Sequence, residues 1–561
     1  MNFLKNIIQI LSSRMDYWPW ALWAPLFLGG WALSRWPAGQ ARLNRAAWAL
    51  PALGGLMLAV FAWFNWVFLR SPVYLGPMSH LQPQIADTSW YFATGRPVYH
   101  GTDSAEIYNL LYGPWLYVIT GTFEKMLGPD IFSAKLPGAL AIGVATVLLF
   151  FLLRKKAGAA FAVLGTGVFA ALLIMLDPVE SLTRADVYIV LGVVLGAWVA
   201  QSPSDLTPWA FGLLAGLCFN LKIHAPVYFL PLLWPAWAAG HRGKSLLAAL
   251  AGAAAAGAAP FLIFPNVSLK NFAWTLGAAS AHGLDPHRFL ECTETFFLLA
   301  LPIAIIAALA CAQNPGPAAE KLRALRPFLA LIFLTFLMLL PFASKYGSGP
   351  HHYLPLLVVL LSLAADFAPQ VRQWLGGPGL TWIAAQALLF SWLGCGFAVG
   401  LTRSYQDAAW LNSSAAWAQD INADLDAILA RHGQDSVILM GAGNDQDYIY
   451  TFFRTRLVFA GMPDGLEPGP LMEFVAAGKH LENLPKLTAA LGQAYPGKKI
   501  LWLVPKGDRP FAMTTLYAEV MRGDYTNKAP LFDAQFQADF QKHYHLVEST
   551  RFYDLYGPTA G

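Results

Sequence analysis

The sequence predicts an all-helical, multi-pass membrane domain followed by a smaller soluble α/β domain. Hydrophobic residues make up 56% of the 561 residues and charged residues only 12%, whereas a soluble protein is usually about 25% charged. Apolar runs of about 20 residues, the length that crosses a hydrocarbon core, recur as far as residue 401. After residue 402 polar residues become frequent and no run is long enough to span. We therefore expect a transmembrane domain at 1–401 and an extracytoplasmic domain at 402–561.

The apolar runs give about 12 expected spans. They lie at roughly 18–34, 47–68, 134–153, 158–175, 185–200, 208–221, 224–239, 245–264, 293–312, 327–343, 351–367 and 379–401. With this count the short basic loops all fall on one side, which the positive-inside rule makes cytoplasmic. These loops contain Arg35, Arg42 and Arg45; Arg154, Lys155 and Lys156; Arg242 and Lys244; Lys321, Arg323 and Arg326; and Arg372.

The opposite, extracytoplasmic side then contains a long first loop at 69–133. Within this loop the stretch 112–128 is apolar, but counting it as a span would move the basic residues 154–156 outside. We expect it instead to form a helix along the outer membrane surface.

The C-terminal domain alternates between two kinds of pattern. Residues 413–433 have helical periodicity, whereas "DSVILM", "RLVFAG" and "KKILWLVP" are short apolar runs typical of buried strands. Strands that alternate with helices predict a largely parallel sheet. The stretch "MGAGND" lacks the third glycine of a dinucleotide fingerprint, so it does not indicate nucleotide binding.

Charge and cysteine content exclude some classes of function. A formal net charge of +4 is too small to indicate a nucleic-acid partner. The 4 cysteines are scattered and show neither a disulfide framework nor zinc spacing.

Ionisable residues recur where the extracytoplasmic loops meet apolar helices. Such residues near membrane depth are costly and indicate function by default. Basic turns suit a phosphate or diphosphate, and a carboxylate nearby suits a general base. The candidates are Asp87 with Arg96 and His100; Arg184 and Asp186 in "SLTRADVYIV"; Lys222 and His224 in "LKIHAP"; and Lys345, His351 and His352 in "SKYGSGPHHYLP".

Structural explanations of the same residues stay open. Asp87 could cap a helix that begins "DTSWYFATG", and Arg184 and Asp186 could be a structural ion pair. The other basic residues could anchor or cap their turns. The aromatic residues Trp90, Tyr91, Phe92, Tyr112 and Trp115 suit either sugar stacking or the membrane interface. No histidine spacing compels a metal site.

Three of these stretches resemble the GT-C superfamily of integral membrane glycosyltransferases, in particular the family 39 protein mannosyltransferase and aminoarabinose-transferase type. They are "ADTSWYFATGRPVYHG" with "YNLLYGPWLYVITGTFEKMLG", "SLTRADVYIV" and "KYGSGPHHYLPLL". The resemblance covers roughly residues 47–401.

This resemblance implies a polyprenyl-phosphate sugar donor and an inverting transfer outside the cytoplasm, with Asp87 as the catalytic carboxylate of the first loop. It implies that Lys222, His224, Lys345, His351 and His352 face the donor phosphate. Family members often have two adjacent acids where this chain has only Asp87, because Asp103 and Glu106 are too far along to form a pair. Participation of a divalent cation therefore stays open.

The resulting hypothesis is a glycosyltransferase of the bacterial inner membrane, with Asp87 as general base and Arg96, His100, Tyr112, Arg184 and Asp186 among the substrate contacts. The acceptor is a lipid, a glycan or a protein. One alternative is a transporter or flippase of lipid-linked glycans, although no internal repeat is visible. Others are a ligase or polymerase that uses a lipid diphosphate, and a scaffold whose soluble domain binds a partner.

Overall fold

The computed structural model describes most of the chain from residue 49 onward. The described residues are 49–72, 81–101, 104, 106–108, 112–176, 182–201, 204–238, 243–280, 283–313, 315–345, 348–374, 380–443, 448–471, 484–507, 509–514 and 530–559. The first predicted span, at 18–34, and the basic residues at 35–45 lie outside this part.

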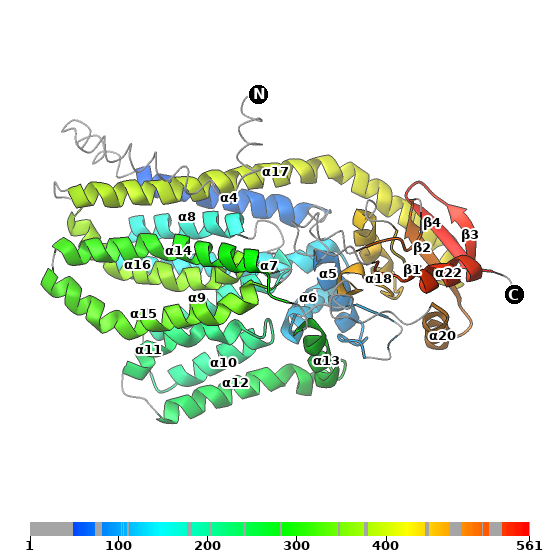
Figure 1. Ribbon diagram of the computed structural model, residues 1–561, viewed down its shortest axis with the longest axis horizontal. Coiled ribbons are helices and arrows are strands. Elements are labelled where there is room, and N and C mark those ends of the chain that lie inside the picture. Colours follow the sequence, from blue (N-terminus) through cyan, green and yellow to red (C-terminus); the bar gives the residue numbers. More distant parts are fainter. Residues whose placement is uncertain are drawn as a thin grey trace.

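The membrane part is a stack of apolar helices (Figure 1). Among the described residues, 6 helices are long and apolar enough to cross a membrane. They are α4 (Ala49–Arg70), α7 (Ile131–Ala157), α8 (Ala159–Leu176), α12 (Gly243–Ile263), α15 (Pro315–Ala343) and α16 (Leu354–Trp374). The expectation of about twelve spans is not confirmed, since several predicted spans fall on shorter helices than the ~20 residues that cross a bilayer. These are α9 (Asp186–Ala200), α10 (Thr207–Phe219) and the pair η3 (Ala225–Phe229) and α11 (Leu230–Ala238).

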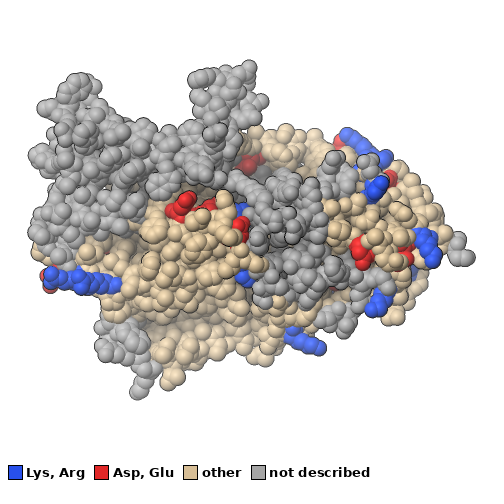
Figure 2. All heavy atoms as spheres, in the orientation of Figure 1, with Lys and Arg blue, Asp and Glu red and all other residues tan. Residues whose placement is uncertain are grey.

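The surface of this part has apolar ridges instead of a polar coat. On α7 the exposed large side chains are Leu140, Val144, Val147 and Phe151. Their spacing of three and four residues puts them on one helix face. Figure 2 shows few charged side chains over the visible helical part, whereas Lys, Arg, Asp and Glu recur over the C-terminal domain. An apolar face of this extent on a long helix is suited to lipid and confirms a membrane protein.

Two short helices from the first loop lie between the apolar stack and the C-terminal domain (Figure 1). They are α5 (Leu81–Ala93) and α6 (Pro114–Leu127). The stretch predicted to be helical at 112–128 is therefore α6, which begins with Pro114 at a position where a missing N–H costs nothing. Two further helices, α13 (Leu269–Ser280) and α14 (Pro286–Gln313), follow α12.

The helix α17 connects the membrane part to the C-terminal domain. It runs without a break from Leu380 to His432, through the predicted boundary at 401/402. It extends along one side of the molecule from the apolar stack to the sheet (Figure 1).

The C-terminal sheet has four strands in the order β1-β2-β4-β3. Its strands are β1 (Ser436–Met440), β2 (Lys499–Pro505), β3 (Tyr544–Ser549) and β4 (Tyr553–Pro558). Strand β1 pairs with β2 in parallel, but the β2–β4 and β4–β3 pairs are antiparallel. The expectation of a largely parallel sheet is wrong because β3 and β4 are joined by a tight turn, which only antiparallel strands allow.

A second correction concerns a predicted strand, which the structure shows to be a helix. The run "RLVFAG" forms α18 (Thr455–Phe459), which follows η5 (Tyr448–Arg454). Leu457 and Val458 are buried and Arg456 is exposed, a pattern that so short an apolar run does not distinguish from a strand. The remaining helices, α20 (Leu484–Ala494) and α22 (Ala534–His543), pack with the sheet.

Candidate functional site

Three of the predicted polar clusters meet at the start of α9. Asp186 is in the first turn of that helix. The Lys222 Nζ lies 2.8 Å from both of its carboxylate oxygens, and the Arg184 Nε lies 3.5 Å from Oδ2. The other end of the Arg184 guanidinium lies 2.9 Å from His351 Nε2. All four side chains are buried. We refer to Arg184, Asp186, Lys222, His224, His351 and His352 as the basic cluster.

The histidines of the basic cluster stack on one another. The ring centroids of His224 and His352 lie 4.7 Å apart, and those of His351 and His352 lie 4.5 Å apart. The Tyr228 hydroxyl donates a hydrogen bond to the backbone carbonyl of His352 and thereby fixes the turn. The buried His224 Nε2 and His352 Nδ1 have no hydrogen-bond partner within the described residues. Lys345, which is partly exposed, lies close enough to act on His224 electrostatically.

The charge of the basic cluster is net positive. Arg184 and Lys222 supply two cations against one carboxylate, Asp186, when the histidines are neutral. Burial strengthens the attraction of such an excess for an anion. Two histidine nitrogens are additionally able to donate or accept hydrogen bonds. The arrangement therefore suits a phosphate group.

The first loop reaches the basic cluster through the start of α6. The Lys222 Nζ lies 5.5 Å from the centre of the Tyr112 ring. The Gly113 amide donates to Leu221 O over 3.1 Å. A Cβ on Gly113 would lie 2.2 Å from the Asn220 carbonyl, so only glycine permits this approach.

Arg96 and His100 are not part of this cluster. The Arg96 Nη2 lies 2.9 Å from both Glu106 oxygens, and its guanidinium stacks over Tyr91 at 3.8 Å. His100 contacts Tyr108 and Trp274 edge-on, with ring centroids 5.4 Å apart in both pairs. Its Nδ1 lies 3.1 Å from Gly101 O. The sequence grouped these residues with Asp87, but the structure gives them other neighbours.

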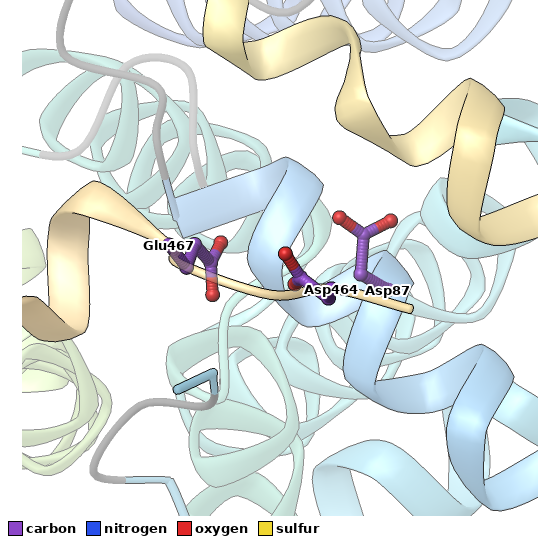
Figure 3. A group of neighbouring side chains, drawn as sticks. All are labelled: Asp87, Asp464 and Glu467. Carbon is purple, nitrogen blue, oxygen red and sulfur yellow. The ribbon is translucent and has the colours of Figure 1, made fainter. Parts of the chain in front are cut away.

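Asp87 faces two acids that sequence reasoning missed. It lies within α5, six residues after the helix begins, so the interpretation as a helix cap is wrong. It is 1% exposed, and neither carboxylate oxygen has a hydrogen-bond partner of good geometry within the described residues. Ligand oxygens of Asp87, Asp464 and Glu467 all lie within 4.8 Å of one another. Figure 3 shows Asp87 on helix α5 and the other two on an extended segment that crosses it. We call these three residues the acidic cluster.

Backbone pairing holds the extended segment against the first loop. The Ile107 amide donates to Gly465 O over 2.7 Å, and the Glu467 amide donates to Ile107 O over 3.0 Å. The Tyr91 hydroxyl accepts a hydrogen bond from the Asp464 amide and donates to Glu106 over 2.7 Å. This pairing places two acids from the C-terminal domain beside an acid of α5.

Arg454 is the cation that the structure places against the acidic cluster. Its Nη1 lies 3.4 Å from Asp464 Oδ1, and its Nε donates to Thr451 O over 2.8 Å. Both Arg454 and Asp464 are 3% exposed. Arg454 therefore offsets part of the mutual repulsion of the acids.

Burial changes the protonation of these acids. Desolvation and then the neighbouring Asp464 raise the pKa of Asp87 and of Glu467 well above their ordinary values, while Arg454 lowers both. Desolvation raises the pKa of Asp464 to about 6 against the opposing effect of Arg454. Glu124 on α6, also fully buried, has a pKa raised first by burial and then by Asp87. The site thus concentrates more negative charge than its surroundings stabilise.

Helix α6 runs between the two clusters. Its start, at Gly113, contacts the turn that contains Lys222, and Glu124 near its end lies within electrostatic reach of Asp87. At 1.5 Å per residue, the interval from 113 to 124 corresponds to ~16 Å of helix. The basic cluster and the acidic cluster therefore lie toward opposite ends of this short helix.

Structural comparison finds solved chains of similar overall arrangement. ArnT from Cupriavidus metallidurans bound to undecaprenyl phosphate is 14% identical, with a TM-score of 0.49 over 90% of this chain and 98% of that chain. The same protein in the apo state is also 14% identical, with a TM-score of 0.48 over 90% of this chain and 97% of that chain. The oligosaccharyltransferase of Archaeoglobus fulgidus in the apo form is 9% identical, with a TM-score of 0.40 over 80% and 69%.

No protein-family model matches the chain. No curated protein matches it either. The function proposed below rests on the side chains of this chain.

Proposed function

We propose that the protein is an integral membrane glycosyltransferase that moves a sugar from a polyprenyl-phosphate donor to an extracytoplasmic acceptor. The observation that carries this proposal is the basic cluster. It combines a buried excess of positive charge with unpartnered histidine nitrogens at the start of apolar helices. A lipid phosphate has its charged group at the membrane boundary and its chain among apolar helices, which matches this placement.

In the proposed reaction the donor phosphate accepts hydrogen bonds from Arg184 and Lys222. The acceptor hydroxyl attacks the anomeric carbon, the bond from this carbon to the phosphate oxygen breaks, and the polyprenyl phosphate leaves with its negative charge. Fixed cations stabilise that charge without rearrangement, and such preorganised electrostatic stabilisation is usually the largest single contribution to catalysis. Attack opposite the leaving group inverts the configuration at the anomeric carbon.

We propose Asp87 as the general base for the acceptor hydroxyl. Because ~16 Å of α6 separates the two clusters, this role requires the acceptor and the donor phosphate to come together between them when both are bound. Burial raises the pKa of Asp87, which makes its carboxylate a stronger base than an exposed aspartate. Arg454 acts in the opposite direction and favours the ionised form that a base requires. The acceptor is a lipid, a glycan or a protein. We assign the protein to the bacterial inner membrane, with both clusters and the C-terminal domain on the extracytoplasmic side.

The test is release of polyprenyl phosphate from a panel of polyprenyl-phosphate sugars by the purified protein, in the presence of an extract of cell-envelope lipids, glycans and proteins that supplies the acceptor. We expect Lys222→Gln to lower the kcat/KM for the donor by about 10²-fold or more, the usual effect of losing one donor to a developing anion. Asp87→Asn should lower kcat by about 10²- to 10⁴-fold. Lys156→Gln is the matched control, because Lys156 is bound instead to Ser362 and Asp366.

Release by the native protein and by Lys156→Gln, but not by the other two variants, supports the proposal. Equal kcat/KM in Lys222→Gln would refute the phosphate site. Absence of release from every donor, in protein that elutes as a folded species, would refute the proposed reaction.

A further inference from the structure

We propose that Asp87, Asp464 and Glu467 form a divalent-cation site that the first extracytoplasmic loop and the C-terminal domain build together. This goes beyond the proposed function, because cation binding can be measured without any donor or acceptor. The sequence leaves a divalent cation open but gives no sign of this set of ligands, since Asp87 and Asp464 are separated by most of the chain.

The spacing of the carboxylates fits a cation that prefers oxygen ligands. Ligand oxygens of the three side chains lie within 4.8 Å of one another. Oxygens on opposite sides of a Ca²⁺ ion, at 2.3–2.6 Å each, are up to about 5 Å apart, so this ion fits the cluster with at most small side-chain adjustments. Mg²⁺ at about 2.1 Å requires opposite oxygens about 4.2 Å apart, which small side-chain rotations provide.

Two neutral polar side chains point to a ligand independently of the acids. Gln84, fully buried on α5, lies beside Glu467, yet neither of its amide atoms has a hydrogen-bond partner of good geometry within the described residues. The Thr455 hydroxyl, on a residue that is 2% exposed, lies beside Asp87 and likewise has no hydrogen-bond partner of good geometry within the described residues. Amide and hydroxyl oxygens are ordinary additional ligands of Ca²⁺ and Mg²⁺. Buried polar atoms are otherwise almost always paired.

The charge balance of the acidic cluster is a third reason to expect a cation. Three ionised carboxylates would face one guanidinium, Arg454, and Glu124 adds further negative charge nearby. A dication neutralises the excess of two charges that Arg454 leaves. Uncompensated charge on buried side chains is costly, and coordination of a metal ion is one of the few ways in which a protein keeps such side chains ionised.

The site is compatible with Asp87 as a base. A dication would keep Asp87 in the ionised form that a base requires, while lowering the basicity that burial alone gives this carboxylate. The same cation holds the segment 462–467 against α5, so the C-terminal domain becomes part of the catalytic region.

Binding is measured with Mn²⁺ as the probe, from the loss of the free-ion EPR signal. The full-length protein in neutral detergent is first treated with EDTA and then freed of the chelator. We expect one Mn²⁺ per chain, displaced by Ca²⁺ or Mg²⁺. Glu467→Gln keeps the shape of the side chain and should weaken Mn²⁺ binding by at least about tenfold. Asp426→Asn, on α17, removes an exposed carboxylate and should bind Mn²⁺ as the native protein does.

Thermal unfolding provides the second readout. In EDTA, Glu467→Gln should have a higher Tm than the native protein, because it removes a buried charge that lacks compensation. Mn²⁺ should raise the Tm of the native protein and of Asp426→Asn, but not that of Glu467→Gln. Mn²⁺ binding of equal strength in native protein and Glu467→Gln would overturn the proposal. So would the absence of Mn²⁺ binding to folded native protein, whatever its transferase activity.

Discussion

Arg454→Gln tests whether the acidic cluster depends on its buried cation. Arg454 lowers the pKa of Asp87, Asp464 and Glu467 alike. Its replacement by a neutral side chain of similar length leaves these acids without that compensation. We expect the variant to be clearly less stable than the native protein at pH 8 and close to it at pH 5, when both are measured in EDTA.

The magnitude follows from the titration of Asp464. With Arg454 present, the pKa of Asp464 is already raised from 3.8 to about 6, which costs the native protein about 3 kcal/mol of stability at neutral pH, because a shift of one pKa unit corresponds to 1.36 kcal/mol. Removing one partner of a buried ion pair typically costs a further 3–5 kcal/mol. Since the folded pKa lies above the unfolded value, the stabilising contribution of this carboxyl is complete below about pH 4 and is lost as the pH rises through about 6. In the variant that pKa is higher still, so the loss continues above pH 6.

The assay is thermal unfolding followed by tryptophan fluorescence at a series of pH values. Arg456→Gln is the matched control, because Arg456 lies two residues away but pairs with Asp426 at an exposed position where both side chains are 47% accessible. Such a pair contributes about 0–1 kcal/mol. The control should therefore resemble the native protein at every pH.

An Arg454→Gln variant with the same Tm deficit at pH 5 and pH 8 would refute the reasoning, because the deficit would then come from lost packing. A deficit that disappears at low pH in Arg454→Gln and also in Arg456→Gln would show that the pH effect does not originate in the acidic cluster.

Two further substitutions test how the clusters are held in place. Gly138→Ala on α7 would put a Cβ 1.8 Å from Leu182 O, which should displace the segment before Arg184 and reduce the rate of donor cleavage, as measured by polyprenyl-phosphate release. Gly143→Ala on the same helix meets nothing within 4 Å and should leave that rate unchanged. Tyr91→Phe removes the hydroxyl that joins Asp464 to Glu106. It should cost about 1–3 kcal/mol of unfolding free energy, seen in the same fluorescence assay, since a buried N–H then loses its acceptor. An unchanged Tm in Tyr91→Phe would contradict this contact.

Composition and periodicity predicted the parts of the fold that depend on local pattern. The long apolar helices, the helical stretch at 112–128 and the strands β1 and β2 all appear where the sequence indicated them. The meeting of Arg184, Lys222 and His351 could also be anticipated, because the charge of the short loops puts their turns on one side of the membrane. Local pattern could not give the pairing direction of β3 and β4, since this depends on which strand each one meets.

The partners of Asp87 depend on contacts between distant segments, and no local pattern reports them. Asp464 and Glu467 lie in "GMPDGLEPG", a glycine- and proline-rich stretch without helical or strand periodicity. Nothing in this stretch indicates which other segment its two acids contact. Glu106, which the sequence places too far from Asp87 for a pair, has a different partner. Its contact is with Arg96, and it fixes Tyr91, which in turn holds Asp464.

The apparent isolation of Asp87 in the sequence therefore has a structural explanation. An acid in a buried helix of an apolar chain needs compensation, and the first loop offers none of its own within the described residues around α5. The C-terminal domain supplies Arg454 together with two more acids, and the bridge between Ile107 and Leu466 sets their position. A domain that brings one cation and two further carboxylates to a buried aspartate increases the local negative charge, which makes sense if the site holds a dication. For this reason cation binding is a sharper test of what the C-terminal domain does than its deletion, which would expose α5 and α6 together.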